Sequence, residues 1–249
     1  MLIQLLTKRI SARLFTRPFS VSAAMTSSIP QSPEVAVGIS AVLRASLATD
    51  SIFKTIPSSL TKSDSSPVTL GDFAAQAIVN TLLGKYFPQD GIVAEEEAQA
   101  LRQDADMRAK VGHLVRDALN RDESHLSDFN KLPGGQKWGK SDEEEEAWLQ
   151  AIDLGAFQGG NQGRFWTLDP IDGTKGFLRG GQYAICLALI ENGQPTLGIM
   201  ACPNLPFNKS DPKPQEGDRS GVNGDGTLFL SVKGSGAWQV SEKVYEVVE

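Results

Sequence analysis

The chain has 249 residues, enough for one large domain or two small ones. Hydrophobic residues make up 40% of it and charged residues 22%, as in an ordinary soluble globular protein. Its formal net charge of −6 argues against a general nucleic-acid-binding surface. An acidic protein that acts on an anionic substrate has to supply local positive charge, and a bound metal ion is one way to do so.

The few cysteines and histidines exclude further classes. Cys186 and Cys202 lie in apolar runs, so we expect them to be buried and reduced. No Cys/His cluster has the spacing of a zinc site. Only two histidines are present, His113 and His125, which argues against a His-centred catalytic triad, and we expect neither to be catalytic.

The first 24 residues differ in composition from the rest of the chain. Basic and apolar residues interleave there, with several Ser and Thr residues and no acidic residue. This pattern is typical of a mitochondrial transit peptide, and a disordered tail is the alternative interpretation. The apolar stretches are too short to span a membrane. Met25 would start a shorter cytoplasmic form, so the sequence predicts either a mitochondrial or a cytoplasmic location.

Residues 25–33 are a Ser/Pro-rich linker that leads into a predicted helix. Ser32 would cap this helix, Pro33 fits its first turn, and Glu34 favours its positive end. Helical spacing is then followed by Val35, Ile39, Val42, Leu43 and Leu47.

Further helices are predicted downstream. The second opens near Asp72 and carries apolar residues on one face. A later one begins behind a capping box formed by Ser141 and Glu144. The other predicted segments are a helix at 106–120 and polar loops at 121–140 and 158–163.

The period changes to that of strands in the last part of the chain. Residues 164–168 are predicted as a strand, and 183–190 and 195–203 as a hairpin closed by an Asn-Gly turn. Helices followed by a block of largely antiparallel strands predict an α+β fold rather than a doubly wound parallel sheet. The remaining predicted segments are a polar insertion at 208–226 and strands at 226–232 and 236–240.

Acidic residues lie at three predicted junctions between elements. Asp72 begins a helix, Glu95 ends a short apolar run, and Asp169 and Asp172 end another. Each has an ordinary explanation as a helix cap, a first helical turn or a tight turn. Together they suggest more, because carboxylates from separate elements can converge, and they repel one another unless a cation joins them. Oxygen ligands without histidine or cysteine suit Mg²⁺.

The stretch from Asp169 to Thr174 also offers a place for phosphate. Asp169 and Asp172 are close enough in sequence to hold two metal ions, with the carbonyl of Ile171 between them. The amides of Gly173 and Thr174 follow at a predicted helix or turn start, where phosphate oxygens bind. These residues predict metal-assisted hydrolysis of a phosphate ester.

Three segments resemble a known family. DPIDGT at 169–174, AEE at 94–96 and SPVT shortly before Asp72 are similar to the lithium-sensitive, magnesium-dependent phosphatase superfamily of inositol monophosphatase. Within it, KGFLRGGQYA at 175–184 resembles the 3′(2′),5′-bisphosphate nucleotidase branch. The resemblance runs from about residue 34 to about residue 238. It implies a layered α/β sandwich of the inositol monophosphatase and fructose-1,6-bisphosphatase type.

The resemblance also implies roles for individual positions. Asp72 and Thr174 would activate the attacking water, with Asp72 polarising the threonine hydroxyl as general base. The family usually has Gly where this chain has Ala94, and alignment to the apolar run makes the next residue the ligand. The magnesium ligands would then be Glu95, Asp169, Asp172 and the carbonyl of Ile171.

The activity implied by the resemblance is hydrolysis of the 3′-phosphate of adenosine 3′,5′-bisphosphate to AMP and phosphate, with lithium sensitivity. The 3′-phosphoadenylyl sulfate analogue would be a second substrate, which links the enzyme to sulfate assimilation. The expected partner is a small-molecule nucleotide, with no nucleic acid and no membrane span. An inositol phosphate or sugar phosphate phosphatase of the same superfamily is the alternative.

The end of the chain departs from the family pattern. The family continues past residue 238 into a second α/β layer with a WDxAAG-like motif, whose aspartate is a further metal ligand. Residues 239–249 do not match it. We therefore expect a family member cut short, with the second α/β layer largely missing. A catalytically inactive fragment is the third hypothesis.

Overall fold

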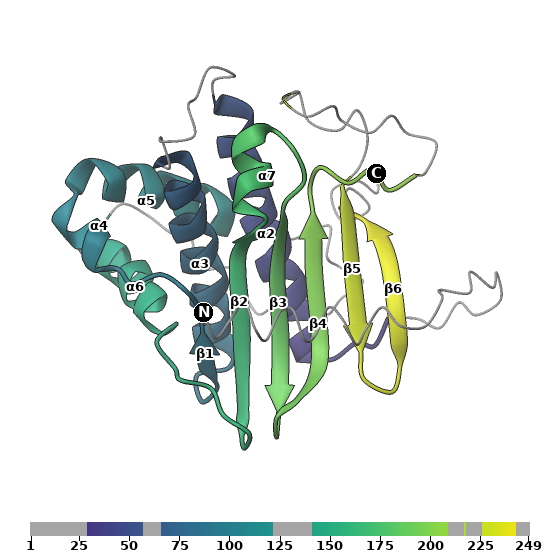
Figure 1. The fold of residues 1–249 in the computed structure, drawn as a ribbon. Coiled ribbons are helices and arrows are strands. Elements are labelled where there is room, and N and C mark those ends of the chain that lie inside the picture. The colour runs from purple at the N-terminus through teal and green to yellow at the C-terminus, as the bar shows by residue number, and fades with distance from the viewer. Residues whose placement is uncertain (1–28, 57–65, 122–140, 209–216, 218–225, 243–249) are drawn as a thin grey trace. The chain divides into compact units, whose positions relative to one another are not determined.

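The computed structural model describes residues 29–56, 66–121, 141–208, 217 and 226–242 (Figure 1). The chain divides into two compact units, Met1–Pro30 and Gln31–Glu249, and all the described helices and strands belong to the second. Several predicted segments lie outside the described residues: the transit segment, His125, residues 122–140 of the polar loop and nearly all of the insertion.

The described residues form six helices and six strands. The helices are α2 (Pro33–Thr55), α3 (Ser66–Tyr86), α4 (Gln99–Gln103), α5 (Ala105–Leu119), α6 (Asp142–Asp153) and α7 (Thr174–Arg179). The strands are β1 (Gly91–Val93), β2 (Arg164–Asp172), β3 (Ala184–Glu191), β4 (Gln194–Cys202), β5 (Thr227–Val232) and β6 (Gly236–Ser241).

The strands form one mixed sheet in chain order, β1 to β6. β1 runs parallel to β2, and every other neighbouring pair is antiparallel. Helices α2 and α3 contact each other and pack against β2, β3 and β4 (Figure 1). The predicted α+β fold is confirmed. The predicted hairpin turn is confirmed as well, because Asn192 and Gly193 between β3 and β4 both have positive φ, at 50° and 72°.

Two helix starts form as their sequences predict. The Ser32 hydroxyl accepts a hydrogen bond from the Val35 N–H at 3.3 Å, at the start of α2. At α6, Ser141 and Glu144 form a reciprocal capping box, in which each side chain accepts from the backbone N–H of the other. Both helices therefore begin where local hydrogen bonding satisfies their first N–H groups.

The predicted start of the second helix is wrong. Helix α3 begins at Ser66, so Asp72 lies in its second turn and is not a helix cap. Pro67 fits the first turn, where its missing N–H is not needed. The helix also accepts Gly71, because α3 passes close to the end of β2 there: a Cβ on Gly71 would lie 2.6 Å from Ile171 Cδ1.

Helix α2 is long and apolar enough to cross a membrane by length and composition alone. However, 72% of its apolar window is buried inside the fold, since α2 packs against α3 and the sheet. Gly38 marks how close this packing is, because a Cβ there would lie 2.5 Å from Ile199 Cδ1 of β4. The apolar residues of α2 are those of a core helix in the described fold.

Arg164 at the start of β2 is the centre of a charged network. Its guanidinium contacts Asp90 at 2.9 Å, Glu34 at 3.1 Å and Glu191 at 3.7 Å. The Trp166 indole N–H also donates to Asp90, at 2.9 Å. These contacts join the start of α2 to the β1 and β2 region.

We expect Glu34→Gln to lower stability at neutral pH but not in acid. Burial raises the pKa of Glu34, but hydrogen bonds from its own backbone, Ser32 and Arg164 and the charge of Arg164 outweigh this effect and lower the pKa overall. A lowered folded-state pKa stabilises the fold above the ordinary value of 4.5, and this stability is lost as the pH falls below it. Thermal unfolding of both proteins from pH 7 to pH 3.5 should show their midpoints converging in acid. A constant difference would contradict the role of the Glu34 charge.

Candidate active site

The first four residues of the DPIDGT motif, Asp169 to Asp172, form a bulge at the end of β2. Asp169 pairs with Cys186 of β3, whereas Asp172 pairs with Ala184, so three steps along β2 match two along β3. One extra residue is accommodated, which bends the strand and reorients its end. The Ile171 side chain is buried, and Asp172 is exposed. The bulge therefore interrupts the regular alternation of side chains along β2 between Asp169 and Asp172.

Helix α7 starts directly after the bulge. Gly173 precedes it with φ 93° and ψ 37°, a left-handed conformation that favours glycine. The Gly173 carbonyl accepts the Phe177 N–H at 3.0 Å, and the Thr174 hydroxyl donates to the Ile171 carbonyl at 3.5 Å. The predicted phosphate-binding residues thus lie at the first turn of a short helix beside the aspartates.

The loop after β1 carries the predicted glutamate ligand. Glu95 is exposed, and the next residue, Glu96, is half-buried. The Glu96 backbone makes two hydrogen bonds with the side chain of Gln76 on α3, at 2.7 and 2.9 Å. Gln76 lies one turn after Asp72 on the same face of α3, so the acidic loop lies against the helix that carries the predicted general base.

Electrostatic coupling shows that the predicted carboxylates are neighbours. Burial is the main cause of the raised pKa of Asp72, about 8, followed by the charges of Glu96, Asp169 and Glu95. Burial and then the charges of Glu95 and Asp172 raise the pKa of Asp169 to about 7, against a hydrogen bond from the Ile171 backbone that lowers it. The charge of Glu95 therefore acts on both Asp72 and Asp169, and the charge of Asp172 acts on Asp169.

Glu96 is a fifth member of this cluster that the sequence interpretation missed. Burial and the charge of Glu95 raise its pKa, and its charge is in turn the largest electrostatic influence on Asp72. The signal was present in the run Glu95, Glu96 and Glu97, but alignment to the apolar run selected one of the three. The contact between Glu96 and Gln76 could not be read from sequence.

The chemistry of this cluster fits a hard cation. All its donors are oxygen atoms, and their mutual repulsion favours the arrival of positive charge. Among the residues that the structure describes, no three Asp, Glu, His or Cys side chains already stand close enough together to hold a metal ion. The charges of these carboxylates act on one another, and sharing a cation would require their side chains to come closer together.

Of the two cysteines expected to be buried, one is fully buried and the other only partly. Cys186 and Cys202 are both free; Cys202 is buried and Cys186 half-buried. Burial is the main cause of the raised pKa of both thiols, so they are protonated at neutral pH. His113 is exposed on α5 and pairs with Asp117 at 3.2 Å. None of these residues belongs to the acidic cluster as a charged group.

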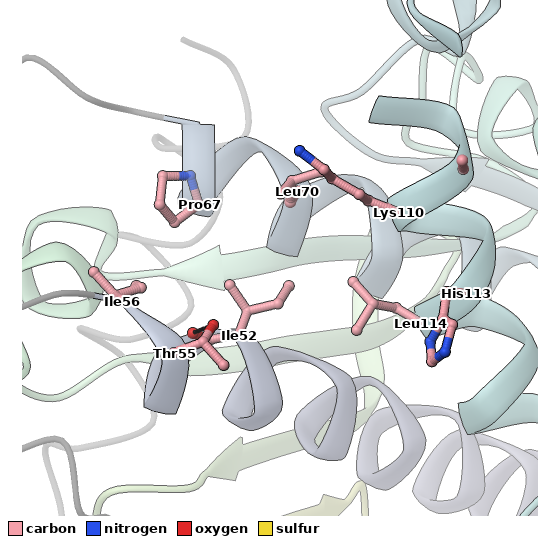
Figure 2. A pocket seen from close by; sticks show the side chains of 9 residues that line it. Ile52, Thr55, Ile56, Pro67, Leu70, Lys110, His113 and Leu114 are labelled. Carbon is pink, nitrogen blue, oxygen red and sulfur yellow. Dashed lines mark hydrogen bonds between the residues drawn. The ribbon is translucent and has the colours of Figure 1, made fainter. Parts of the chain in front are cut away.

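A separate open groove of about 520 Å³ lies between α2, the start of α3 and α5 (Figure 2). Its lining is mainly apolar and includes Ile52 and Leu70, with Lys110 and His113 contributed by α5. It contains no carboxylate and none of the predicted site residues. The groove therefore has no part in the acidic cluster.

Comparison with known proteins identifies the class. Residues 31–248 match the inositol monophosphatase family, and the chain belongs to this family. Its members are generally metal-dependent. A solved structure, CysQ from Bacteroides thetaiotaomicron, described as a bacterial member of the inositol monophosphatase family, has a TM-score of 0.39 and 17% identity. The match covers 85% of this chain and 49% of the CysQ chain.

The curated relatives of the chain include three 3′(2′),5′-bisphosphate nucleotidases. The 3′(2′),5′-bisphosphate nucleotidase of Schizosaccharomyces pombe is 44% identical over 214 residues, covering 84% of this chain and 55% of that protein. The protein of the same name from Emericella nidulans is 45% identical over 200 residues, covering 79% and 54%. Nucleotidase 1 of Arabidopsis thaliana is 42% identical over 181 residues, covering 71% and 47%. The chain thus spans about half the length of the curated relatives it matches.

Proposed function

We propose that this chain belongs to a magnesium-dependent 3′(2′),5′-bisphosphate nucleotidase, which hydrolyses the 3′-phosphate of adenosine 3′,5′-bisphosphate to AMP and phosphate. The observation behind the chemistry is the cluster of mutually repelling carboxylates beside the first turn of α7. The substrate class comes from the relatives, which carry this name at 44–45% identity. Proposed finer properties are lithium sensitivity, action on 3′-phosphoadenylyl sulfate and a place in sulfate assimilation.

We propose a task for each side chain of the cluster. Glu95, Asp169, Asp172 and the Ile171 carbonyl would hold Mg²⁺, which when bound supplies the positive charge that a phosphate ester and its leaving oxygen need. Asp72 would accept a hydrogen bond from the Thr174 hydroxyl, and this hydroxyl would orient the attacking water. The water oxygen forms the new bond to phosphorus as the bond to the 3′-oxygen breaks, and a proton ends on that oxygen.

The first turn of α7 would bind the phosphate. The N–H groups of Gly173 and Thr174 lie at a helix start, where backbone donors favour anionic oxygens. Their position follows the bulge directly, so the phosphate donors and every proposed metal ligand except Glu95 come from the six residues 169–174.

We also propose a location: mitochondrial, from the composition of the N-terminal 24 residues, or cytoplasmic if translation starts at Met25.

Phosphate release by the purified chain is the direct test. We expect release from adenosine 3′,5′-bisphosphate that requires Mg²⁺, is blocked by Li⁺, and is abolished by Asp169→Asn. Inositol 1-phosphate, measured in parallel, should yield little phosphate. Equal or faster release from inositol 1-phosphate would overturn the nucleotide assignment, and no turnover in a folded chain would favour the inactive fragment.

A further inference from the structure

Gln76 makes an unusual set of contacts for a core residue. Its side chain is fully buried on α3. The Oε1 atom accepts the Glu96 N–H at 2.9 Å, and Nε2 donates to the Glu96 carbonyl at 2.7 Å. The same Nε2 also donates to the Ile152 carbonyl near the end of α6, at 2.9 Å. One amide therefore joins α3, the acidic loop and α6.

The acidic loop is fixed on both sides of this contact. The Ala94 N–H donates to the Gly155 carbonyl at 2.9 Å, and the Ala98 N–H donates to the Asp153 carboxylate at 2.8 Å. Gly155 leaves room for the contact, because a Cβ there would lie 2.8 Å from Gln76 Nε2 and 2.9 Å from Ala94 Cβ. Ala94, Glu96 and Ala98 are thus each hydrogen-bonded to α3 or to the end of α6 and the residues that follow it.

Asp72 stands four residues before Gln76, on the same face of α3. We propose that Gln76 is a positioning residue, which holds the backbone of Glu96 so that Glu95 and Glu96 face Asp72 and Asp169. The inference rests on the proposed magnesium-dependent function and deepens it. Gln76 itself would touch neither metal nor substrate, because its three polar contacts are all to backbone groups within the fold.

Both the oxygen and the nitrogen of the Gln76 amide are needed to bind the Glu96 backbone. An apolar side chain of similar length would leave the Glu96 N–H and carbonyl without these partners at a part-buried position. The loop would then keep the hydrogen bonds of Ala94 and Ala98 but lose those of Glu96 to residue 76. Residues that support metal ligands from behind usually change metal affinity by 10–100-fold when they are replaced.

Asn80 provides a matched control on the same helix. It is fully buried one turn after Gln76, and its amide donates to the carbonyls of Ala151 and Ile152 at 3.0 and 3.4 Å. These contacts reach α6 but not the acidic loop. Asn80→Leu therefore removes a buried amide from α3 as Gln76→Met does, and should leave the loop in place.

The test measures Mg²⁺ binding to the full chain by calorimetry, together with amide hydrogen exchange in residues 94–98. We expect Gln76→Met to weaken Mg²⁺ binding by about 10–100-fold and to speed exchange in this loop. Asn80→Leu should lower stability but leave both readings within about twofold of the wild type.

Three results would be decisive. Gln76→Met with wild-type Mg²⁺ affinity would overturn the positioning role, as would an equal loss in Asn80→Leu. Absence of Mg²⁺ binding in the wild type would overturn the proposed function instead, and the exchange data would still show whether Gln76 holds the loop. If Gln76→Met fails to fold, Gly155→Ala disturbs the same amide from the other side and should give the same loss.

Discussion

Asp72→Asn is expected to abolish phosphate release and to raise the thermal stability of the metal-free protein. The loss of activity follows from removing the proposed general base, which typically contributes about 10²–10⁴-fold to rate. The gain in stability follows from the surroundings of Asp72, where burial and neighbouring charges raise its pKa to about 8. At pH 8 and above, the folded chain carries an ionised carboxylate that its surroundings disfavour, and asparagine removes that charge.

The sign of the pH effect provides a second measurement. A raised folded-state pKa means that the fold prefers the protonated acid, so metal-free wild type should gain stability as the pH falls from 9 to 6. Asp72→Asn should gain less over this range. Melting curves in EDTA measure both effects, and a midpoint a few degrees higher is expected for the variant at pH 8.

Asp117→Asn is the matched control for this experiment. Asp117 is exposed on α5, where it pairs with His113 at 3.2 Å. Its replacement should leave both phosphate release and the melting temperature nearly unchanged. A lower melting temperature for Asp72→Asn than for the wild type in EDTA would show that Asp72 stabilises the fold. That result would contradict the destabilising effect expected from burial and the neighbouring charges.

Local chemistry explains which parts of the fold could be predicted. The Ser32 cap, the Ser141–Glu144 capping box and the Asn-Gly turn depend on hydrogen bonds and dihedral angles within a few residues. The apolar run at 164–168 predicts the strand that ends in the aspartates, and β2 forms there and continues to Asp172. These features need no knowledge of distant segments, and they form where the sequence predicts them.

The errors arise where distant segments decide the outcome. Helix α3 starts at Ser66 rather than near Asp72, and its Gly71 fits because Ile171, a hundred residues later, packs against it. Glu96 joins the cluster through Gln76, twenty residues away in sequence. Propensity and spacing carry no information on such contacts. The carboxylates themselves were recognisable because their types and junction positions indicate chemistry before their partners are known.

Two sets of contacts support the acidic cluster. Gln76 holds the acidic loop against α3, and the bulge of β2 with Gly173 holds the aspartates and the start of α7. An aromatic group anchors α7 in turn, since Phe177 is fully buried with ring centroids 5.6 Å from Phe53 and 4.8 Å from Tyr183. Displacing α7 should therefore disturb both stability and the phosphate-binding turn.

Gly176→Ala is expected to produce this displacement. A Cβ on Gly176 would lie 2.0 Å from the backbone oxygen of Gln182, far inside contact distance. Neither side can yield easily, because the Gly181 N–H donates to the Gly176 carbonyl at 2.7 Å and Phe177 is fixed in its aromatic group. We expect the free energy of unfolding to fall by about 2–3 kcal/mol.

Gly198→Ala is the control, because a Cβ on this glycine of β4 would meet nothing within 4 Å. Its stability should stay within about 0.5 kcal/mol of the wild type. Urea unfolding measures both variants, and phosphate release tests whether the shift reaches Thr174. If Gly176→Ala is as stable as Gly198→Ala, the segment at Gln182 can move away from α7. The close approach of Gly176 to Gln182 would then not be what fixes the phosphate-binding turn beside Asp169 and Asp172.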